Sequence, residues 1–411
     1  MKLPLFSHMR EAAQKLMNRS ASATLQQAMD SLRGHPSMRP AAPAQPTMRD
    51  INPPPPRTAA EAAPEVTAKA APDPGTAAPP PNGARPNPTT HPTEFAQDML
   101  DRMGIKVDLQ ANIDRAIDVG AIMHPAPEVA LPDGAQFIKS SYTNHAGTRN
   151  YKLYIPASYH GQAMPLLVML HGCTQNPDDF AVGTQMNQVA EEMKCFVVYP
   201  EQTANANQSK CWNWFSAIDQ QHGQGEPSII AGIAQQIIDD YPVNERQVYV
   251  AGLSAGGAMA VIVGTLYPEL FAAVGVHSGL PFASAQDLPS ALTAMKRGVA
   301  SPRKAGDGSQ PIIVFHGDSD STVHPRNGEQ VIEQLLHRQL GKQSVQSGSV
   351  PNGHRYTQTT HTKADGTPIG EHWVVHGAGH AWFGGNAGGT YTDAKGPDAS
   401  REMLRFFRTV S

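Results

Sequence analysis

The sequence predicts an α/β domain with a mostly parallel central sheet and helices on both faces. Short, continuous apolar runs are typical of strands that are buried on both sides. Six such runs occur, at residues 151–155, 165–170, 195–199, 248–251, 272–277 and 311–315. Helical stretches alternate with them, at residues 178–193, 228–239, 257–266, 328–340 and 400–410. This alternation indicates a doubly wound sheet, in which ligands bind beyond the carboxyl ends of the strands.

A change of composition along the chain separates this domain from what precedes it. Residues 36–95 contain 17 of the 36 prolines, including the run 53–56. Such a segment favours extended polyproline II conformation and cannot bury a core. We therefore expect an N-terminal helical or tail segment at 1–35, a disordered Pro/Ala-rich linker at 36–95, a short helical connector at 96–130 and the α/β domain at 131–411.

The N-terminal segment has two interpretations. Its apolar residues, which include Leu5, Met9, Leu16 and Leu25, line one side of a short helix that would bind a surface. A weakly ordered tail is the alternative. Charged residues interrupt every apolar run here, so we expect neither a signal peptide nor a transmembrane segment. The net charge of -4 gives no reason to expect nucleic-acid binding.

The most informative motif is Gly-Leu-Ser-Ala-Gly at residues 252–256. A strand-like run precedes it and a small, apolar helical stretch follows it. Strand, sharp turn and helix form the context of a nucleophile elbow, in which the serine hydroxyl projects above the sheet. The motif therefore predicts Ser254 as a nucleophile, whereas a plain tight turn is the structural alternative.

A serine nucleophile needs a base in contact with it and a carboxylate behind that base. In this class of sheet, the chain order is serine, acid, histidine. The polar loop after the strand 311–315 supplies Asp318 and Asp320, of which we prefer Asp320. Near the C-terminus, a glycine-framed loop presents His380 as the base.

A metal site is the competing interpretation of the histidines. His372, His376 and His380 recur every four residues. This spacing aligns side chains on a helix, but the segment reads as a strand followed by a glycine loop. We therefore expect neither a metal nor another cofactor.

An oxyanion hole is predicted at the turn that follows the strand 165–170. Its expected donors are the backbone amides of Cys173 and of Ala255, the residue after the nucleophile. Aromatic residues gather in two nearby stretches of sequence. We expect Trp212, Trp214 and Trp382 to line a substrate groove, with ordinary core packing as the alternative.

The chain has three cysteines. Cys195 lies in a buried strand and reads as an inert core thiol. Cys173 and Cys211 both lie in predicted loops near the site, and the sequence leaves open whether they pair. A disulfide would favour an oxidising compartment, whereas the missing signal peptide argues against export.

Five motifs, occurring in order, resemble the polyhydroxybutyrate (PHB) depolymerase family of esterases, which is related to feruloyl and acetylxylan esterases. They are LHGCTQ at 170–175, CWNWF at 211–215, GLSAGG at 252–257, HGDSDSTV at 316–323 and GHAW at 379–382. The resemblance implies an α/β-hydrolase fold and serine-dependent hydrolysis of short-chain polyhydroxyalkanoate or 3-hydroxybutyrate esters. It implies Ser254, Asp320 and His380 as the triad and the Cys173 amide in the oxyanion hole. It also implies a Cys173–Cys211 bridge and a substrate contact by Trp214.

The resemblance leaves substrate and location open. Feruloyl or acetylxylan esters are the alternative substrates, and a non-catalytic granule-surface binding protein is the alternative of another class. Secreted depolymerases of the family carry a signal peptide and a C-terminal polymer-binding module, and neither is expected here. A cytoplasmic or granule-associated location is therefore favoured, with the N-terminal helix as the element that would touch a granule.

Overall fold

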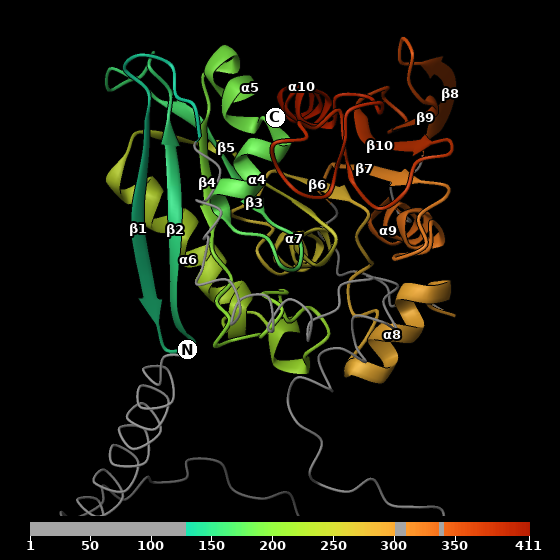
Figure 1. The fold of residues 1–411 in the computed structure, drawn as a ribbon, viewed down its shortest axis with the longest axis horizontal. Helices are drawn as coiled ribbons and strands as arrows, with labels where there is room; N and C mark the ends of the chain where they lie inside the picture. The colour runs from blue at the N-terminus through green and yellow to red at the C-terminus, as the bar shows by residue number, and fades with distance from the viewer. Residues whose placement is uncertain (1–128, 301–309, 337–340) are drawn as a thin grey trace, which may run out of the picture. The chain divides into compact units, whose positions relative to one another are not determined.

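The computed structural model describes residues 129–300, 310–336 and 341–411. All of these residues fall within one compact unit (Figure 1). The segments predicted at 1–35 and 36–95, and nearly all of the connector at 96–130, lie outside the described residues. Within the described ranges, no helix combines the length and apolar character that crossing a bilayer requires.

The core of the domain is one sheet of ten strands in the order β1-β2-β4-β3-β5-β6-β7-β10-β9-β8. Six neighbouring strands in the middle of the sheet, β4, β3, β5, β6, β7 and β10, are mutually parallel. The strands at both edges pair in antiparallel orientation. In Figure 1 the sheet runs from β1 at the left to β8 at the right. The strands are β1 Gln136–Asn144, β2 Gly147–Ile155, β3 Met164–Leu170, β4 Phe196–Pro200, β5 Val243–Leu253, β6 Ala273–His277, β7 Ile312–Gly317, β8 Lys342–Ser349, β9 Arg355–Thr362 and β10 Pro368–Val375.

Each face of the sheet buries its own apolar layer. Along β3, Leu166 and Val168 join one core cluster, while Leu167 and Met169 join the other. This alternation follows from the two-residue period of a strand. Because both faces are covered, the central strands read as continuous apolar runs in the sequence.

The helices divide between these two layers. The first layer contains residues of α6 Gly225–Asp240, α7 Ala255–Leu266, α8 Leu288–Arg297 and α9 Arg326–Leu336. The second contains residues of α4 Pro177–Thr184, α5 Met186–Met193 and α10 Ala399–Val410. A short 3-10 helix, η1 Ala217–Gln220, and a two-stranded parallel sheet of β11 Trp382–Phe383 and β12 Thr392–Asp393 complete the domain. The predicted α/β class with helices on both faces is confirmed.

Two sequence-based expectations differ from this structure. The predicted helix at 178–193 is wrong in one respect, because Gln185 has a φ of 53° and divides it into α4 and α5. The strands β1, β8 and β9 were not predicted. Their side chains are mostly polar, and seven of the eight residues of β8 are exposed, so they carry no apolar signal.

Candidate active site

Ser254 lies at the sharp turn between β5 and α7. Its φ of 58° and ψ of -118° are strained for a residue with a side chain. The glycines on either side make this turn sterically feasible. A Cβ atom on Gly256 would lie 2.0 Å from the carbonyl oxygen of Leu170, and one on Gly252 would lie 2.4 Å from the backbone of Gly256. The structure therefore contains the predicted elbow, and its geometry depends on both glycines.

Backbone hydrogen bonds fix the elbow on both sides. The amide of Ser254 donates to the carbonyl oxygen of His277 on β6 at 2.9 Å, and Ala258 donates to the carbonyl oxygen of Ser254 at 2.9 Å. Helix α7 begins at Ala255, directly after the serine. The positive end of the helix dipole therefore lies beside the serine, where it favours developing negative charge.

His380 and Asp320 form a buried pair. The Nδ1 atom of His380 lies 2.7 Å from Oδ2 of Asp320, and the exposed fractions of the two side chains are 13% and 0%. The other carboxylate oxygen, Oδ1, accepts hydrogen bonds from the amides of Thr322 and Val323, both at 2.9 Å. The carboxylate is thus held in place and orients the imidazole ring through Nδ1.

The charge of Asp320 is stabilised in this position. Burial raises the pKa of its carboxyl group, but the hydrogen bonds from His316 and His380 outweigh burial and hold this pKa well below its usual range. His316 is fully buried, and its Nε2 lies 3.5 Å from Oδ2 of Asp320 and 2.8 Å from the carbonyl oxygen of Val323. Asp320 therefore remains an anion next to His380.

Asp318, the alternative acid, has a different partner. Its Oδ2 lies 2.9 Å from Nδ1 of His376, and its Oδ1 accepts a hydrogen bond from the amide of Gly377 at 2.7 Å. The Nε2 atom of His376 lies 2.9 Å from Oγ1 of Thr357. Both ring nitrogens of His376 are thus engaged by residues outside the pocket, whereas Asp320 is paired with His380.

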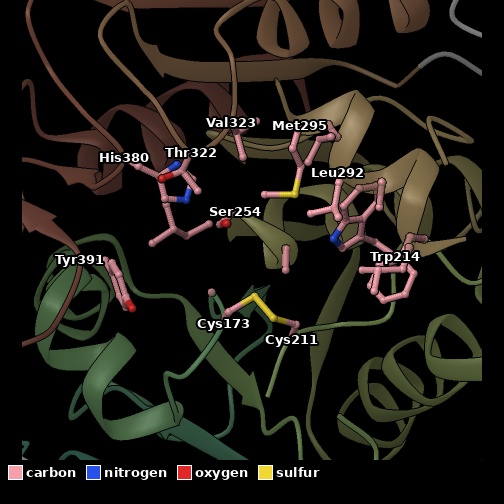
Figure 2. A pocket seen from close by; sticks show the side chains of 17 residues that line it. Cys173, Cys211, Trp214, Ser254, Leu292, Met295, Thr322, Val323, His380 and Tyr391 are labelled. Atoms are coloured by element: carbon pink, nitrogen blue, oxygen red, sulfur yellow. A yellow bond between two sulfur atoms is a disulfide. The ribbon is translucent and has the colours of Figure 1, made fainter. Parts of the chain in front are cut away.

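Ser254 and His380 face the same cavity, which has a volume of about 200 Å³ (Figure 2). Apolar side chains make up most of its wall. They belong to Trp214, Phe215, Leu253, Leu280, Leu288, Ala291, Leu292, Met295 and Val323. None of the 17 described residues that line the cavity is Asp, Glu, Lys, Arg, Asn or Gln. The cavity therefore combines a small polar centre with an apolar wall, which is typical of small-molecule sites.

The predicted oxyanion turn forms the floor of this cavity. Gly172, Cys173 and Ala255 all line it. Within the described part of the chain, the amide nitrogens of Cys173 and Ala255 have no hydrogen-bond acceptor. Cys173 is joined by a disulfide to Cys211, with an S–S distance of 2.00 Å. Two unpaired amides at the edge of the cavity suit a developing oxyanion.

Buried side chains hold the oxyanion turn from behind. The indole Nε1 of Trp212 donates to the carbonyl oxygen of His171 at 3.1 Å. Burial lowers the pKa of His171 to about 4, so the ring is neutral and its Nε2 accepts a hydrogen bond from the amide of Gln202 at 3.1 Å. The amide of Thr174 donates to the carbonyl oxygen of Ser209 at 2.7 Å. These contacts hold the turn from its buried side.

A hydrogen-bonded bridge links this turn to the loop between β11 and β12. Oε1 of Gln175 accepts from the amide of Gly172 at 2.9 Å, and its Nε2 donates to Oδ2 of Asp179 at 2.9 Å. The carboxylate of Asp179 also accepts from the amide and the hydroxyl of Thr390, at 2.9 and 2.6 Å. We call Gln175, Asp179 and Thr390 the Gln–Asp–Thr bridge.

The structure assigns different places to the three predicted tryptophans. Trp214 lines the cavity, as predicted. The expectation for Trp212 and Trp382 is wrong, because both are buried outside the cavity, with exposed fractions of 0% and 1%. Trp382 donates from Nε1 to Oγ of Ser400 at 3.0 Å and stacks on His277. These two residues support the loops of the site rather than contact its contents.

Two parts of the wall were missed at the sequence level. One is α8, whose cavity-lining residues Leu288, Ala291, Leu292 and Met295 recur at helical spacing. This spacing, preceded by the N-cap residue Asp287, is a signal that identifies an amphipathic helix. The other is Tyr391, which lines the cavity from the β11–β12 loop. Its sequence context of glycine and threonine gives no signal of a site.

His372, His376 and His380, which recur every four residues in the sequence, are not gathered into one cluster. His376 and His380 are engaged by different aspartates, as described above, and His372 lies on β10. Among the residues that the structure describes, no group of three or more His, Cys, Asp or Glu side chains is arranged to hold a metal ion.

Comparisons with known proteins place the chain among esterases. Residues 149–343 match the family model described as esterase PHB depolymerase. The chain is 31% identical to poly(3-hydroxyalkanoate) depolymerase C of Paucimonas lemoignei, over 59% of this chain and 60% of that protein. It is 29% identical to poly(3-hydroxybutyrate) depolymerase of Ralstonia pickettii, over 56% and 50%. It is 27% identical to acetylxylan esterase A of Talaromyces purpureogenus, over 60% and 70%.

A solved acetyl xylan esterase from Aspergillus awamori covers 67% of this chain, with 19% identity and a TM-score of 0.48. The match spans 50–60% of the length of the two depolymerases named above. Both are homologues of this chain. The similarity to the esterase PHB depolymerase family therefore lies in the stretch 149–343, which contains Ser254.

Proposed function

We propose that this protein is a serine carboxylic ester hydrolase that acts on short-chain polyhydroxyalkanoate or 3-hydroxybutyrate esters. The observation that carries the proposal is the cavity itself. It presents a serine on a strained elbow and a histidine backed by a buried aspartate within an otherwise apolar wall. These are the parts that acyl transfer from an ester requires.

Each residue has a defined role in the proposed reaction. His380 takes the proton of Ser254 as Oγ attacks the ester carbonyl carbon, and then delivers this proton to the departing alkoxide. Asp320 keeps Nδ1 of His380 protonated and stabilises the imidazolium ion. Water then attacks the acyl-serine with the same base, releases the acid and restores Ser254. The reaction needs no metal or organic cofactor at any step.

The amides of Cys173 and Ala255 are the proposed oxyanion donors. They stabilise the negative charge that develops on the carbonyl oxygen, and they are already oriented before substrate binds. Removal of one such donor in other hydrolases costs about 3 kcal/mol of transition-state stabilisation. The disulfide to Cys211 and the hydrogen bonds behind the turn support the position of the Cys173 amide.

The cavity wall favours aliphatic esters over sugar esters. A polysaccharide exposes many hydroxyl groups, and burying these without partners is unfavourable. The wall has no Asp, Glu, Asn, Gln, Lys or Arg side chain to bind them. A 3-hydroxyacyl unit carries a methyl or short alkyl branch that suits Leu292, Met295 and Trp214. Acetylxylan ester hydrolysis remains the second candidate, because acetylxylan esterases are among the homologues.

Two measurements test the proposal. The first compares the wild type and Ser254→Ala on p-nitrophenyl butyrate, where we expect the variant to lose nearly all activity. Retained activity would contradict the serine mechanism. The second compares release of 3-hydroxybutyrate from its oligomers and polymer, of acetate from acetylated xylan and of ferulate from a feruloyl ester. Cleavage of the sugar or feruloyl esters with the hydroxybutyrate esters untouched would overturn the proposed substrate.

Contact with a polymer granule through residues 1–35 is the second part of the proposal. It rests on the apolar residues of that segment, which lies outside the described residues. In the full chain, Leu16→Glu with Leu25→Glu should reduce co-sedimentation with polyhydroxybutyrate granules. Ser20→Glu with Thr24→Glu adds the same charge at polar positions and serves as the control. Equal sedimentation of both variants would remove this part of the proposal.

A further inference from the structure

Tyr391 holds an unusual backbone conformation beside the catalytic serine. Its φ is 53°, a left-handed conformation that large side chains rarely adopt. Its carbonyl oxygen accepts a hydrogen bond from the amide of Trp382 at 2.7 Å, and β12 begins at the next residue. Strained residues of this kind persist where the surrounding structure fixes them, commonly at ligand sites.

The Gln–Asp–Thr bridge fixes this residue relative to the oxyanion turn. Gln175 and Asp179 are buried, with exposed fractions of 2% and 7%. They connect Gly172 on the turn to Thr390, the residue before Tyr391. Thr390 itself is exposed, but its amide and its hydroxyl both donate to the buried carboxylate of Asp179. The backbone directly before Tyr391 is therefore tied to the oxyanion turn, and this places the Tyr391 side chain on the cavity wall.

The hydroxyl of Tyr391 is available to a ligand. It lies 3.1 Å from Oγ1 of Thr174, and either hydroxyl group can be the donor of this hydrogen bond. The Thr174 hydroxyl also lies 2.6 Å from the carbonyl oxygen of Cys173, and its proton can rotate between the two acceptors. When Thr174 donates to Tyr391, the phenol proton is left to donate to a carbonyl oxygen in the cavity.

The position of Tyr391 identifies which part of an ester it would meet. In Figure 2, Tyr391 and His380 lie on one side of Ser254, whereas Trp214, Leu292 and Met295 lie on the other. His380 must protonate the departing oxygen in the proposed reaction, so the alcohol portion lies on its side. The apolar side then receives the acyl chain, and Tyr391 faces the alcohol portion.

We propose that the hydroxyl of Tyr391, positioned by Thr174 and the Gln–Asp–Thr bridge, binds a carbonyl group in the alcohol portion of the substrate. The site would thus select esters whose alcohol is itself a hydroxy acid or a hydroxy-acid ester, such as the next unit of an oligoester. This inference rests on the proposed function and adds a leaving-group specificity to it.

The reaction balances with this assignment. Attack by Oγ of Ser254 breaks the bond between the acyl carbon and the alkoxy oxygen, and the electron pair of that bond leaves on the alkoxy oxygen. The proton from His380 completes the hydroxyl group of the released hydroxy acid or ester. Tyr391 gives up no proton, and it contacts a carbonyl group that stays unchanged in the product.

The test uses two butyrate esters that share their acyl group. One is the ester of methyl 3-hydroxybutyrate, and the other is the ester of 2-hexanol, a similar secondary alcohol without a carbonyl group. The measured quantity is the ratio of their kcat/KM values in each variant of the full chain. We expect Tyr391→Phe to lower this ratio about fivefold, the loss of one hydrogen bond between neutral groups. Intrinsic differences between the two alcohols cancel when variants are compared.

Two further variants complete the experiment. Tyr142→Phe removes a half-buried tyrosine hydroxyl that is not on this cavity wall, and it should keep the wild-type ratio. Thr174→Ala should lower the ratio and Thr174→Ser should restore it, because the serine hydroxyl can still orient Tyr391. An unchanged ratio in Tyr391→Phe would overturn the proposed subsite while leaving ester hydrolysis intact. Failure of the wild type to cleave either ester would contradict the proposed function itself, and the subsite with it.

Discussion

Two aspartate–histidine pairs lie side by side in this domain, and only one of them faces the serine. Asp320 with His380 and Asp318 with His376 come from the same two loops, and their N–O distances are 2.7 and 2.9 Å. Their exposure differs more than their geometry. The Asp320 and His380 side chains are 0% and 13% exposed, whereas those of Asp318 and His376 are 40% and 36% exposed.

The difference shows that a short aspartate–histidine contact does not make a catalytic pair by itself. The second ring nitrogen of His376 contacts Thr357, while His380 lines the cavity with Ser254. An exposed ion pair also contributes little, because water screens it. Burial and the position relative to the serine therefore separate the proposed catalytic pair from the pair that joins two loops.

The largest expected effect separates the two histidines. His380→Ala removes the proposed base and should lower kcat for p-nitrophenyl butyrate by about 10⁴- to 10⁶-fold, as in other serine hydrolases. His376→Ala removes a ring that lies outside the cavity and should change kcat less than about threefold. Steady-state kinetics on both purified variants check this, and comparable losses in the two would remove the distinction between the pairs.

Substitution of the two aspartates should likewise lower kcat far more at Asp320 than at Asp318. Asp320→Asn keeps the shape of the side chain but no longer stabilises the imidazolium, and we expect kcat to fall about 10⁴-fold. Asp318→Asn should lower kcat by only a few fold. If Asp318→Asn were the more damaging substitution, the acid would have been assigned to the wrong residue. Circular dichroism of both variants controls for folding.

Packing between the acid and histidine loops gives the third prediction. A Cβ atom on Gly317 would lie 2.2 Å from the carbonyl oxygen of Ala378, whereas one on Gly379 would meet nothing within 4 Å. Gly317→Ala should therefore lower the free energy of unfolding by about 1–3 kcal/mol, and Gly379→Ala by less than about 0.5 kcal/mol. Urea denaturation measures both. Equal stabilities would show that the two loops separate easily.

The smallest expected effect concerns pH. Burial raises the pKa of Asp318, but hydrogen bonds from His376 and the Gly377 amide outweigh it, so this pKa also lies below its usual range. A carboxyl group with a depressed native pKa stabilises the fold above its unfolded pKa of about 3.9, and this contribution is lost as the pH falls. When the pH is lowered from 6 to 3.5, the free energy of unfolding should therefore fall by more in the wild type than in Asp320→Asn, which lacks such a carboxyl group.

The same measurement compares how much each aspartate contributes to the loss of stability at low pH. Asp318→Asn should remove a smaller part of this acid sensitivity than Asp320→Asn, because the Asp318–His376 pair is more exposed. Urea denaturation at the two pH values checks the order. A larger change in Asp318→Asn than in Asp320→Asn would contradict the ranking drawn from burial.

The sequence predicts the elbow well because its signals are local. A strand, a serine between two glycines and a helix follow one another directly, and each glycine has a steric reason in the structure. The central strands are equally visible, because burial on both faces leaves them continuously apolar. The strands β8 and β9 escape prediction because polar side chains cover them.

Residues in loops are harder to predict, because distant packing decides their direction. Trp212 and Trp214 are two positions apart, yet one donates to the carbonyl oxygen of His171 and the other lines the cavity. The choice between Asp318 and Asp320 likewise depends on how the loop after β7 meets the loop after β10. The position of Tyr391 depends on hydrogen bonds that it and Thr390 make with residues more than 200 positions earlier.

The Gln–Asp–Thr bridge has a consequence for any attempt to exchange loops between relatives. Asp179 lies on α4 and is buried, and three of its hydrogen bonds come from Gln175 and Thr390. Transplanting the β11–β12 loop alone, with another residue in place of Thr390, would leave this carboxylate short of donors in the interior. The oxyanion turn, α4 and the Tyr391 loop must therefore be inherited, or engineered, as one unit.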